Sequence, residues 1–190
     1  MLLNPSIWPE CPAEFDANGL ALVLLALPSG TRRAEASALA RSALRTITGR
    51  LLSIAAAQVP LSEGQQGPTL TGIASGIHIS LSYAGDRVLI GLSKGRALGV
   101  DIVAIESIPE FEMLSRLYLP KAARLAVLES PLRDASFALA WAQTEASCKA
   151  LSLPLAEIDE EREYAYAGCE LLECGKTNGY RMAVALQRKN

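Results

Sequence analysis

Trp141, Glu145 and Lys149 recur at every fourth position of a segment whose composition is typical of one continuous helix. Side chains four residues apart lie on the same helix face, so we expect an indole, a carboxylate and an ammonium group close together. Another acid, Asp101, interrupts the apolar run Leu98–Val103. A carboxylate in an apolar strand and an acid–lysine pair on a helix are groups that could hold a divalent metal ion and a phosphorylated ligand.

Structural explanations for the same residues are also open. A buried carboxylate is costly unless it is paired, so Asp101 could simply be neutralised by an arginine or a backbone cap. Glu145 before Lys149 at i, i+4 is the favoured orientation of an ordinary surface pair, worth about 0.3–0.5 kcal/mol. Trp141 on the same face indicates a face that points inward or lines a pocket.

Magnesium is the metal ion that this set of groups favours. Mg²⁺ in proteins takes one or two carboxylates together with phosphate oxygens and water. Asp101 and Glu145 would meet that need, and Lys149 would then neutralise a phosphate or hold a leaving group. The sequence thus favours phosphate chemistry that depends on a metal ion.

Several other classes of protein are not expected. Ser80 and Ser82 lack a GxSxG context, and no P-loop or GxGxxG motif is present. His78 is the single histidine and is expected to have a structural role. Eighteen basic and twenty acidic residues nearly cancel, so no nucleic-acid groove is expected.

The sequence also predicts where the protein works. The apolar run 20–27 is too short to span a bilayer, and acidic residues precede it where a signal peptide would be basic. The four cysteines form no CxxC pair, so we expect free thiols and no structural zinc. These features predict a cytoplasmic protein with no membrane partner.

The pattern of apolar and turn residues predicts the elements that position the candidate groups. We expect strands at 20–27, 77–81, 87–93, 98–105, 164–173 and 180–186. We expect helices at 31–52, 110–118, 121–129 and 134–151, turns at 83–86 and 175–179, and a loop at 64–68. The first helix should bury a stripe of Leu39, Ala43, Ile47 and Leu51, and Asp134 should cap the last helix.

A strand, a long helix and two further strands thus follow one another twice. This order predicts an α+β fold of two similar subdomains, 1–95 and 96–190, each a small, mostly antiparallel sheet packed on a long helix. Because the duplicated subdomains would let one chain build the site, we expect a monomer.

The order of three segments resembles a known family. They are Ser80–Val88, then Gly99-Val100-Asp101-Ile102, then Trp141–Leu151. In this order and spacing they resemble the 4′-phosphopantetheinyl transferase superfamily, of the monomeric type with two subdomains. Its members show a Ser-His-Ser/Ala-Gly-Asp turn, a Gly-Val-Asp-Ile-Glu strand and a Trp-x-x-Lys-Glu-Ala-x-x-Lys-Ala helix. The resemblance covers roughly residues 30 to 155.

The resemblance implies transfer of the phosphopantetheine arm of coenzyme A to a serine of an acyl or peptidyl carrier protein. It implies that Asp101 and Glu145 bind a Mg²⁺ ion that bridges to the pyrophosphate, with Lys149 near the phosphates and the incoming hydroxyl. Ser82 falls at the family serine that contacts the nucleotide, and Tyr83 follows it. Basic residues of the first long helix would also hold the nucleotide, and the candidates are Arg32, Arg33 and Arg45.

Several positions depart from the family pattern. Tyr83 stands where the family has a histidine that contacts phosphate, and Val103 stands where it has a third acid. Thr144 stands in the place of a lysine, and Ala122 in the place of a glutamate. The family's Gly-Lys-Pro appears as Gly67-Pro68, and no Gly-x-Gly turn follows the last helix. Hydrogen bonds to charged groups are worth about 1.5–3 kcal/mol, so the lost histidine and lysine could weaken coenzyme A binding by about two to four orders of magnitude. The Tyr83 hydroxyl could offset part of this loss.

Three functional hypotheses therefore remain. The first is an active transferase, in which Glu145 or a water on the metal ion serves as the base. The second is a catalytically degenerate relative that binds coenzyme A or a carrier protein without turnover. The third is a magnesium-dependent phosphotransfer or hydrolysis enzyme of another type, for which the sequence offers no motif.

Overall fold

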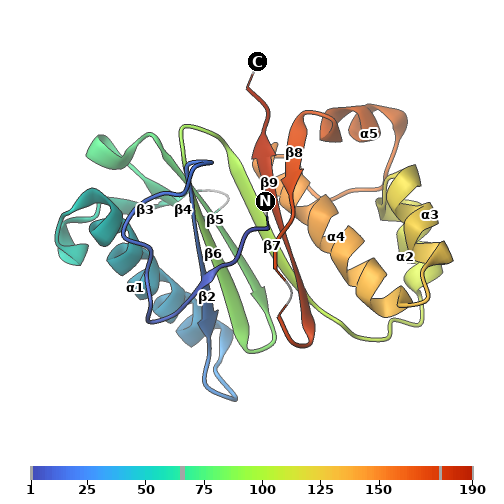
Figure 1. Ribbon diagram of the computed structural model, residues 1–190, viewed down its shortest axis with the longest axis horizontal. Helices are drawn as coiled ribbons and strands as arrows, with labels where there is room; N and C mark the ends of the chain where they lie inside the picture. Colours follow the sequence, from blue (N-terminus) through green and yellow to red (C-terminus); the bar gives the residue numbers. More distant parts are fainter. Residues whose placement is uncertain (1, 65–66, 176, 190) are drawn as a thin grey trace. The chain divides into compact units, whose positions relative to one another are not determined.

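A computed structural model of the chain describes residues 2–64, 67–175 and 177–189. Its architecture is α+β, as predicted (Figure 1). The chain divides into two compact units. Asn4–Leu98 form the N-terminal unit, and Gly99–Asn190 with Met1–Leu3 form the C-terminal unit. The division thus falls after residue 98, where the sequence placed it after residue 95.

The N-terminal unit is a sheet with one long helix and a small hairpin. Its elements are β1 (Ser6–Ile7), β2 (Leu20–Ala26), α1 (Arg33–Leu52), η1 (Ala56–Gln58), β3 (Leu61–Gly64), β4 (Gly67–Leu70), η2 (Gly72–Ala74), β5 (Ile77–Ala84) and β6 (Arg87–Lys94). The main sheet has the order β1-β2-β6-β5, in which β1 is parallel to β2 and the other pairs are antiparallel. The predicted loop at 64–68 is wrong at its ends, because Gly64 pairs with Gly67 where β3 and β4 meet. Residues 65–66 of this predicted loop lie outside the described residues.

Helix α1 packs its alanine-rich face on this sheet. Its buried apolar positions are Ala36, Ala40, Ala43, Leu44 and Ile47, which pack against apolar residues of β2 and β6. The predicted stripe was wrong at Leu39, whose side chain is 43% exposed. A strict four-residue spacing drifts about 40° around a helix at each step, so it leaves the inward face that the 3.6-residue period maintains.

In the described part of the C-terminal unit, all four helices lie between β7 and β8 in the chain. Its elements are β7 (Leu98–Ala104), α2 (Phe111–Tyr118), α3 (Lys121–Glu129), α4 (Arg133–Ala150), α5 (Glu160–Tyr166), β8 (Cys169–Leu172) and β9 (Tyr180–Gln187). The sheet has the order β7-β9-β8, and α4 lies along β9 (Figure 1). Of the predicted turn at 175–179, residue 176 lies outside the described residues, and Thr177 forms a bridge with Tyr180.

Two predictions for the C-terminal unit are wrong. The expected strand at 164–173 is instead the end of α5 followed by β8. Helix α5 begins where the Asp159 carboxylate accepts a hydrogen bond from the backbone N–H of Arg162, and three glutamates in its first turn favour a helix N-terminus. Asp134 does not cap α4, because the helix already begins at Arg133 and Asp134 lies within its first turn.

Three strands of each unit follow the same order in their sheet. In the N-terminal unit, β2 leads into α1, and the hairpin β5–β6 returns so that the last strand, β6, lies beside β2. In the C-terminal unit, β7 leads into the helices, and β8 and β9 return so that β9 lies beside β7. The order β2-β6-β5 in the N-terminal unit thus corresponds to the order β7-β9-β8 in the C-terminal unit, and β1 is an additional edge strand beside β2.

Close packing of β7 on α4 depends on Gly99. A Cβ atom added at Gly99 would lie 1.8 Å from the carbonyl oxygen of Ala146 and 2.8 Å from the backbone nitrogen of Ala150. The facing positions of α4 are small, since Ala142, Ala146 and Ala150 are all buried there. Strand and helix approach so closely only because neither carries a larger side chain at the contact.

We therefore expect Gly99→Ala to lower the free energy of unfolding by at least about 2 kcal/mol, since the overpacked methyl group has only backbone to displace. Urea denaturation followed by circular dichroism measures the change. Gly76→Ala is the control, because a Cβ atom at Gly76 meets nothing within 4 Å. Equal stabilities of the two variants would contradict the close approach at Gly99.

The beginning of the chain belongs to the C-terminal unit. Leu3 is buried, and its backbone N–H donates to the carbonyl of Glu173 over 2.8 Å. The carbonyl of Leu3 accepts a hydrogen bond from the N–H of Gly175 over 2.7 Å, and Leu3 bridges Cys174 in parallel. Residues far apart in the sequence thus form one edge of this unit.

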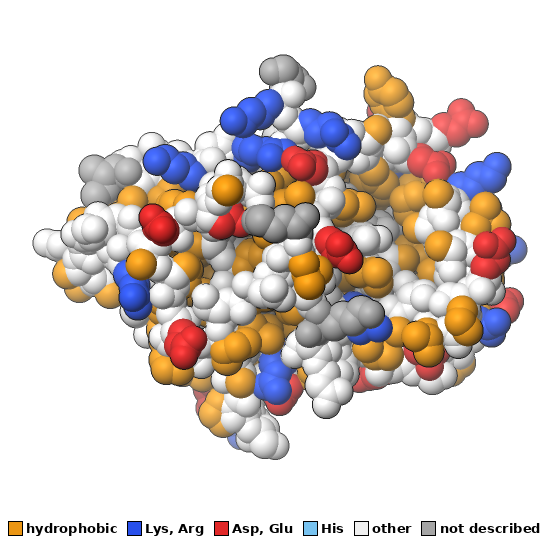
Figure 2. Space-filling view, viewed as in Figure 1, with side chains coloured by type: hydrophobic (Ala, Val, Ile, Leu, Met, Phe, Trp, Pro, Cys, Tyr) orange, Lys and Arg blue, Asp and Glu red, His pale blue; other side chains and the backbone are white. Residues whose placement is uncertain are grey.

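The surface carries mixed side chains. Acidic and basic groups are interspersed over the face shown in Figure 2, in keeping with their near-equal numbers. Several apolar side chains of α2 and α3 are exposed, among them Met113, Leu125 and Leu128. In the described residues, no helix has the length and apolar character needed to cross a membrane. The four cysteines carry free thiols, as expected.

Candidate functional site

Asp101 lies on the face of β7 that is turned toward α4. Alternate residues of a strand share a face, and Gly99, Asp101 and Val103 occupy the positions that meet this helix. The Asp101 side chain is only 4% exposed. The predicted burial of this carboxylate is therefore confirmed, and its partner among the charged side chains of α4 is a lysine.

Lys149 binds three oxygen-bearing groups of the C-terminal unit. Its ammonium Nζ lies 2.7 Å from Oδ1 of Asp101 and donates to the Val100 carbonyl over 3.1 Å. It also lies 3.9 Å from Oε2 of Glu145. The structure thus brings the three predicted residues of this site, Asp101, Glu145 and Lys149, together around one positive charge.

Trp141 orients the carboxylate of Glu145. The indole Nε1–H donates to Oε1 of Glu145 over 2.8 Å, and the other oxygen of that carboxylate is the one nearest Lys149. The indole is held in turn by Tyr118 and Phe137, each with its ring centre 5.6 Å away. Glu145 is therefore held by an aromatic partner that is itself packed between two rings, a contact that the sequence did not predict.

Residues that depart from the family pattern have structural roles in this unit. Val103 packs against the apolar cluster that includes Ala142 and Ala146. Thr144 is buried, and its hydroxyl donates to the Ala140 carbonyl over 2.9 Å, an i−4 bond within α4. An acid at 103 would have to share that apolar cluster, and a lysine at 144 would require burial of its charge.

The remaining predicted residues lie in the N-terminal unit. The guanidinium of Arg33, at the start of α1, stacks over the ring of Tyr83 at 3.8 Å from its centroid. Such a cation–π contact holds the charged group flat while its N–H groups stay free to meet an anion. Ser82 is buried beside Tyr83 in β5. Arg33 and Tyr83 thus form one ordered pair.

The side chains of two other arginines of α1, Arg41 and Arg45, form local hydrogen bonds. Arg45 donates to the carbonyl of Val59 over 2.9 Å, which ties the segment after η1 to the helix. Arg41 binds both carboxylate oxygens of Glu63 at 2.7 and 2.8 Å, and this pairing lowers the pKa of the Glu63 carboxyl. Arg32 precedes α1, and its backbone N–H donates to Glu35. Of these arginines, Arg33 is the one stacked on a predicted ligand-binding residue.

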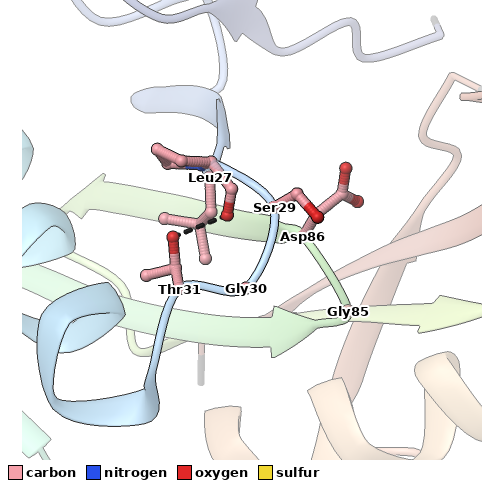
Figure 3. A pocket seen from close by; sticks show the side chains of 7 residues that line it. Leu27, Ser29, Gly30, Thr31, Gly85 and Asp86 are labelled. Atoms are coloured by element: carbon pink, nitrogen blue, oxygen red, sulfur yellow. Dashed lines mark hydrogen bonds between the residues drawn. The ribbon is translucent and has the colours of Figure 1, made fainter.

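A pocket of about 300 Å³ lies at one end of the N-terminal unit (Figure 3). It is lined by the β2–α1 loop, Leu27–Thr31, and by the β5–β6 turn, Gly85 and Asp86. The Thr31 hydroxyl donates to the Pro28 carbonyl over 2.6 Å, which closes the loop. The sequence predicted the turn at 83–86 but gave no signal that it forms a pocket with the β2–α1 loop.

The site in the C-terminal unit offers two carboxylates, Asp101 and Glu145, as possible ligands of a Mg²⁺ ion. Asp101 and Glu145 come from different elements and already contact one cation, the Lys149 ammonium. Such oxygen donors are the ones that Mg²⁺ prefers. Within 2–64, 67–175 and 177–189, no group of three or more His, Cys, Asp or Glu residues is placed to hold a metal ion. Two carboxylates are therefore what this site offers, with the remaining ligands left to phosphate and water.

Cys148, the residue before Lys149 in α4, contacts helix α5. Its Sγ lies 3.2 Å from the hydroxyl of Tyr166. Burial, and then the contact with Cys148, raises the pKa of Tyr166 to about 12. This contact links α5 to the residue next to Lys149.

The raised pKa gives a prediction for alkaline pH. The folded protein holds the Tyr166 proton up to about pH 12, whereas the unfolded chain loses it near 10.0. The stabilisation is therefore complete below pH 10 and is lost as the pH rises toward 12. We expect the free energy of unfolding of the wild type to fall more steeply over this range than that of Tyr166→Phe, measured by urea denaturation. Parallel curves would contradict the prediction.

No protein-family model matches this chain, and no curated protein matches it. The function must therefore be argued from the residues and their arrangement.

Proposed function

We propose that this protein is a 4′-phosphopantetheinyl transferase that transfers phosphopantetheine from coenzyme A to a serine of an acyl or peptidyl carrier protein. The observation that carries the proposal is the convergence of Asp101 from β7 with Glu145 and Lys149 from α4. These are the residues that the resemblance assigns to the metal ion and the phosphates. The corresponding order of three strands in the two units supports the duplicated fold that the family would require.

The proposed reaction is displacement at phosphorus. The serine oxygen attacks the phosphorus that carries the pantetheine arm, and the bond from this phosphorus to the bridging oxygen breaks. The nucleotide leaves as 3′,5′-ADP with the electron pair of that bond, and the serine proton passes to a base. Positioning and charge stabilisation supply most of the catalysis of such a transfer.

Glu145 is the residue best placed to be the base. Its carboxylate is oriented by the Trp141 N–H and is partly exposed, so a hydroxyl can reach it. The Lys149 ammonium would bind the pyrophosphate oxygens and stabilise their charge. Mg²⁺, held by Asp101 and Glu145, would supply further neutralisation of the pyrophosphate. Ser82, Tyr83 and Arg33 of the N-terminal unit are the residues that the resemblance assigns to the nucleotide.

A second candidate is a relative that binds coenzyme A or a carrier protein without turnover. The observation that favours it is the commitment of Val103 and Thr144 to packing within the C-terminal unit. The third acid and the additional lysine of the family pattern therefore have no substitute at those positions. Such a relative would bind the same ligand but would not catalyse the transfer.

Mass spectrometry of apo carrier proteins separates the two candidates. Incubation with coenzyme A and Mg²⁺ should add one phosphopantetheinyl group to the carrier serine and release 3′,5′-ADP in equal amount. Calorimetry with coenzyme A, with and without Mg²⁺, is the companion measurement. Binding without any mass increase on acyl and peptidyl carriers would favour the second candidate, and neither binding nor transfer would refute both.

A further inference from the structure

The Lys149 ammonium occupies the place of a bound cation. Its neighbours are the Asp101 carboxylate at 2.7 Å, the Val100 carbonyl at 3.1 Å and the Glu145 carboxylate at 3.9 Å. Carboxylate and carbonyl oxygens are also the ligands of a hard divalent cation. An ammonium group and a metal ion cannot both lie against these oxygens, so they must compete for them.

The two sides of this contact differ in freedom. The Asp101 side chain is 4% exposed and is held in the sheet, whereas the Lys149 side chain is 33% exposed. Lysine carries its charge on a flexible four-carbon stem, so its ammonium can leave for solvent or for a ligand while its Cα atom stays in place. Lys149 is therefore the partner that can move, and Asp101 is the partner that stays.

We infer that Lys149 is a displaceable internal counter-ion, which a divalent cation replaces at Asp101 and Glu145. In the free protein, the ammonium neutralises the buried carboxylate and lowers the affinity of the pair for metal ions. A phosphate ligand gives the ammonium a new partner, so binding of the phosphate and of the cation favour each other. The phosphate half of this inference rests on the proposed transferase function, whereas the competition with the cation does not.

This coupling would determine the order in which the phosphate ligand and the divalent cation bind. Without phosphate, a divalent cation must displace an ammonium that is paired with both acids, so the cation binds weakly. With a pyrophosphate bound, Lys149 has left the carboxylates, and the cation no longer has to displace the ammonium from Asp101 and Glu145. The site would then fill with metal ion mainly when its phosphate ligand is present.

Titration with Mn²⁺, followed by electron paramagnetic resonance, tests the competition in the full chain without any substrate. Lys149→Met removes the ammonium, and we expect it to bind Mn²⁺ at least about tenfold more tightly than the wild type. Adding Glu145→Gln to Lys149→Met should abolish that gain. Lys121→Met, at an exposed position of α3, is the control and should match the wild type. Affinity no higher in Lys149→Met than in the wild type would overturn the inference.

Loss of the ammonium could also unfold the protein, and this outcome is informative as well. Lys149→Gln keeps a hydrogen-bond donor for Asp101 and serves as the second variant. If either variant is unfolded without metal, Mn²⁺ should restore its circular dichroism spectrum, and failure to do so would also overturn the inference. The transfer assay with wild-type protein is separate, so absence of carrier modification together with tighter Mn²⁺ binding would refute the transferase proposal alone.

Discussion

Glu145→Gln is expected to lower the rate of phosphopantetheine transfer by at least about a hundredfold while the protein stays folded. The amide keeps the shape of the side chain but can neither accept the serine proton nor neutralise a metal ion, and general-base catalysis alone contributes about 10²–10⁴-fold. The rate of conversion of an apo carrier protein, followed by mass spectrometry, measures the effect. This is the largest effect on activity that the proposed function predicts.

Two further variants of α4 sharpen that result. Trp141→Phe keeps the aromatic packing against Tyr118 and Phe137 but removes the N–H that orients Glu145. It should lower the rate by about ten- to a hundredfold, since a hydrogen bond to a charged group is worth about 1.5–3 kcal/mol. Asp134→Asn changes an exposed acid of the same helix and should leave the rate unchanged. A Glu145→Gln rate above half that of the wild type would exclude Glu145 as the base.

The second large effect concerns stability. Lys149→Met should lower the free energy of unfolding by about 3 kcal/mol in the presence of EDTA, because it leaves the carboxylate of Asp101 buried without its ammonium. Asp101→Asn should cost only about 1 kcal/mol, since the amide still accepts a hydrogen bond and the lysine can reach water. Urea denaturation measures both.

The double variant Asp101→Asn with Lys149→Met completes the comparison. Once the buried charge is gone, the lysine keeps its contact with Glu145, a partly exposed pair that contributes little, so the double variant should be about as stable as Asp101→Asn alone. Equal losses in the two single variants, adding fully in the double variant, would show that the pair contributes no coupling. A larger loss of stability in Lys149→Met than in Asp101→Asn would therefore reflect the deeper burial of Asp101.

Local patterns predicted most of the fold. Strand β2, helix α1, the β5–β6 hairpin and strand β7 lie within a few residues of their expected ranges. The predictions failed where two local signals competed. Residues 164–173 contain β-favouring residues, yet the Asp159 cap and the acidic first turn of α5 extended a helix into that range. The capping residue Asp159 lies before residues 164–173, so the composition of that range alone did not indicate a helix there.

The candidate site could be predicted only in part. The spacing of Trp141, Glu145 and Lys149 fixed their common face, since helix geometry alone determines it. The pairing of Lys149 with Asp101 instead depends on how closely β7 approaches α4, which Gly99 permits. Likewise, Arg33 could not be distinguished from Arg45 by sequence, because stacking on Tyr83 depends on the packing of α1 against the sheet.

The contacts of Leu3 set the order in which the protein can be completed during synthesis. The N-terminal unit has all of its residues once residue 98 has left the ribosome, but the backbone partners of Leu3 are Glu173 and Gly175. Leu3 can therefore reach its place only after Glu173 and Gly175 have been synthesised. A fragment of residues 99–190 made alone lacks this edge, so the C-terminal unit would need residues from the far end of the chain to be expressed in its native form.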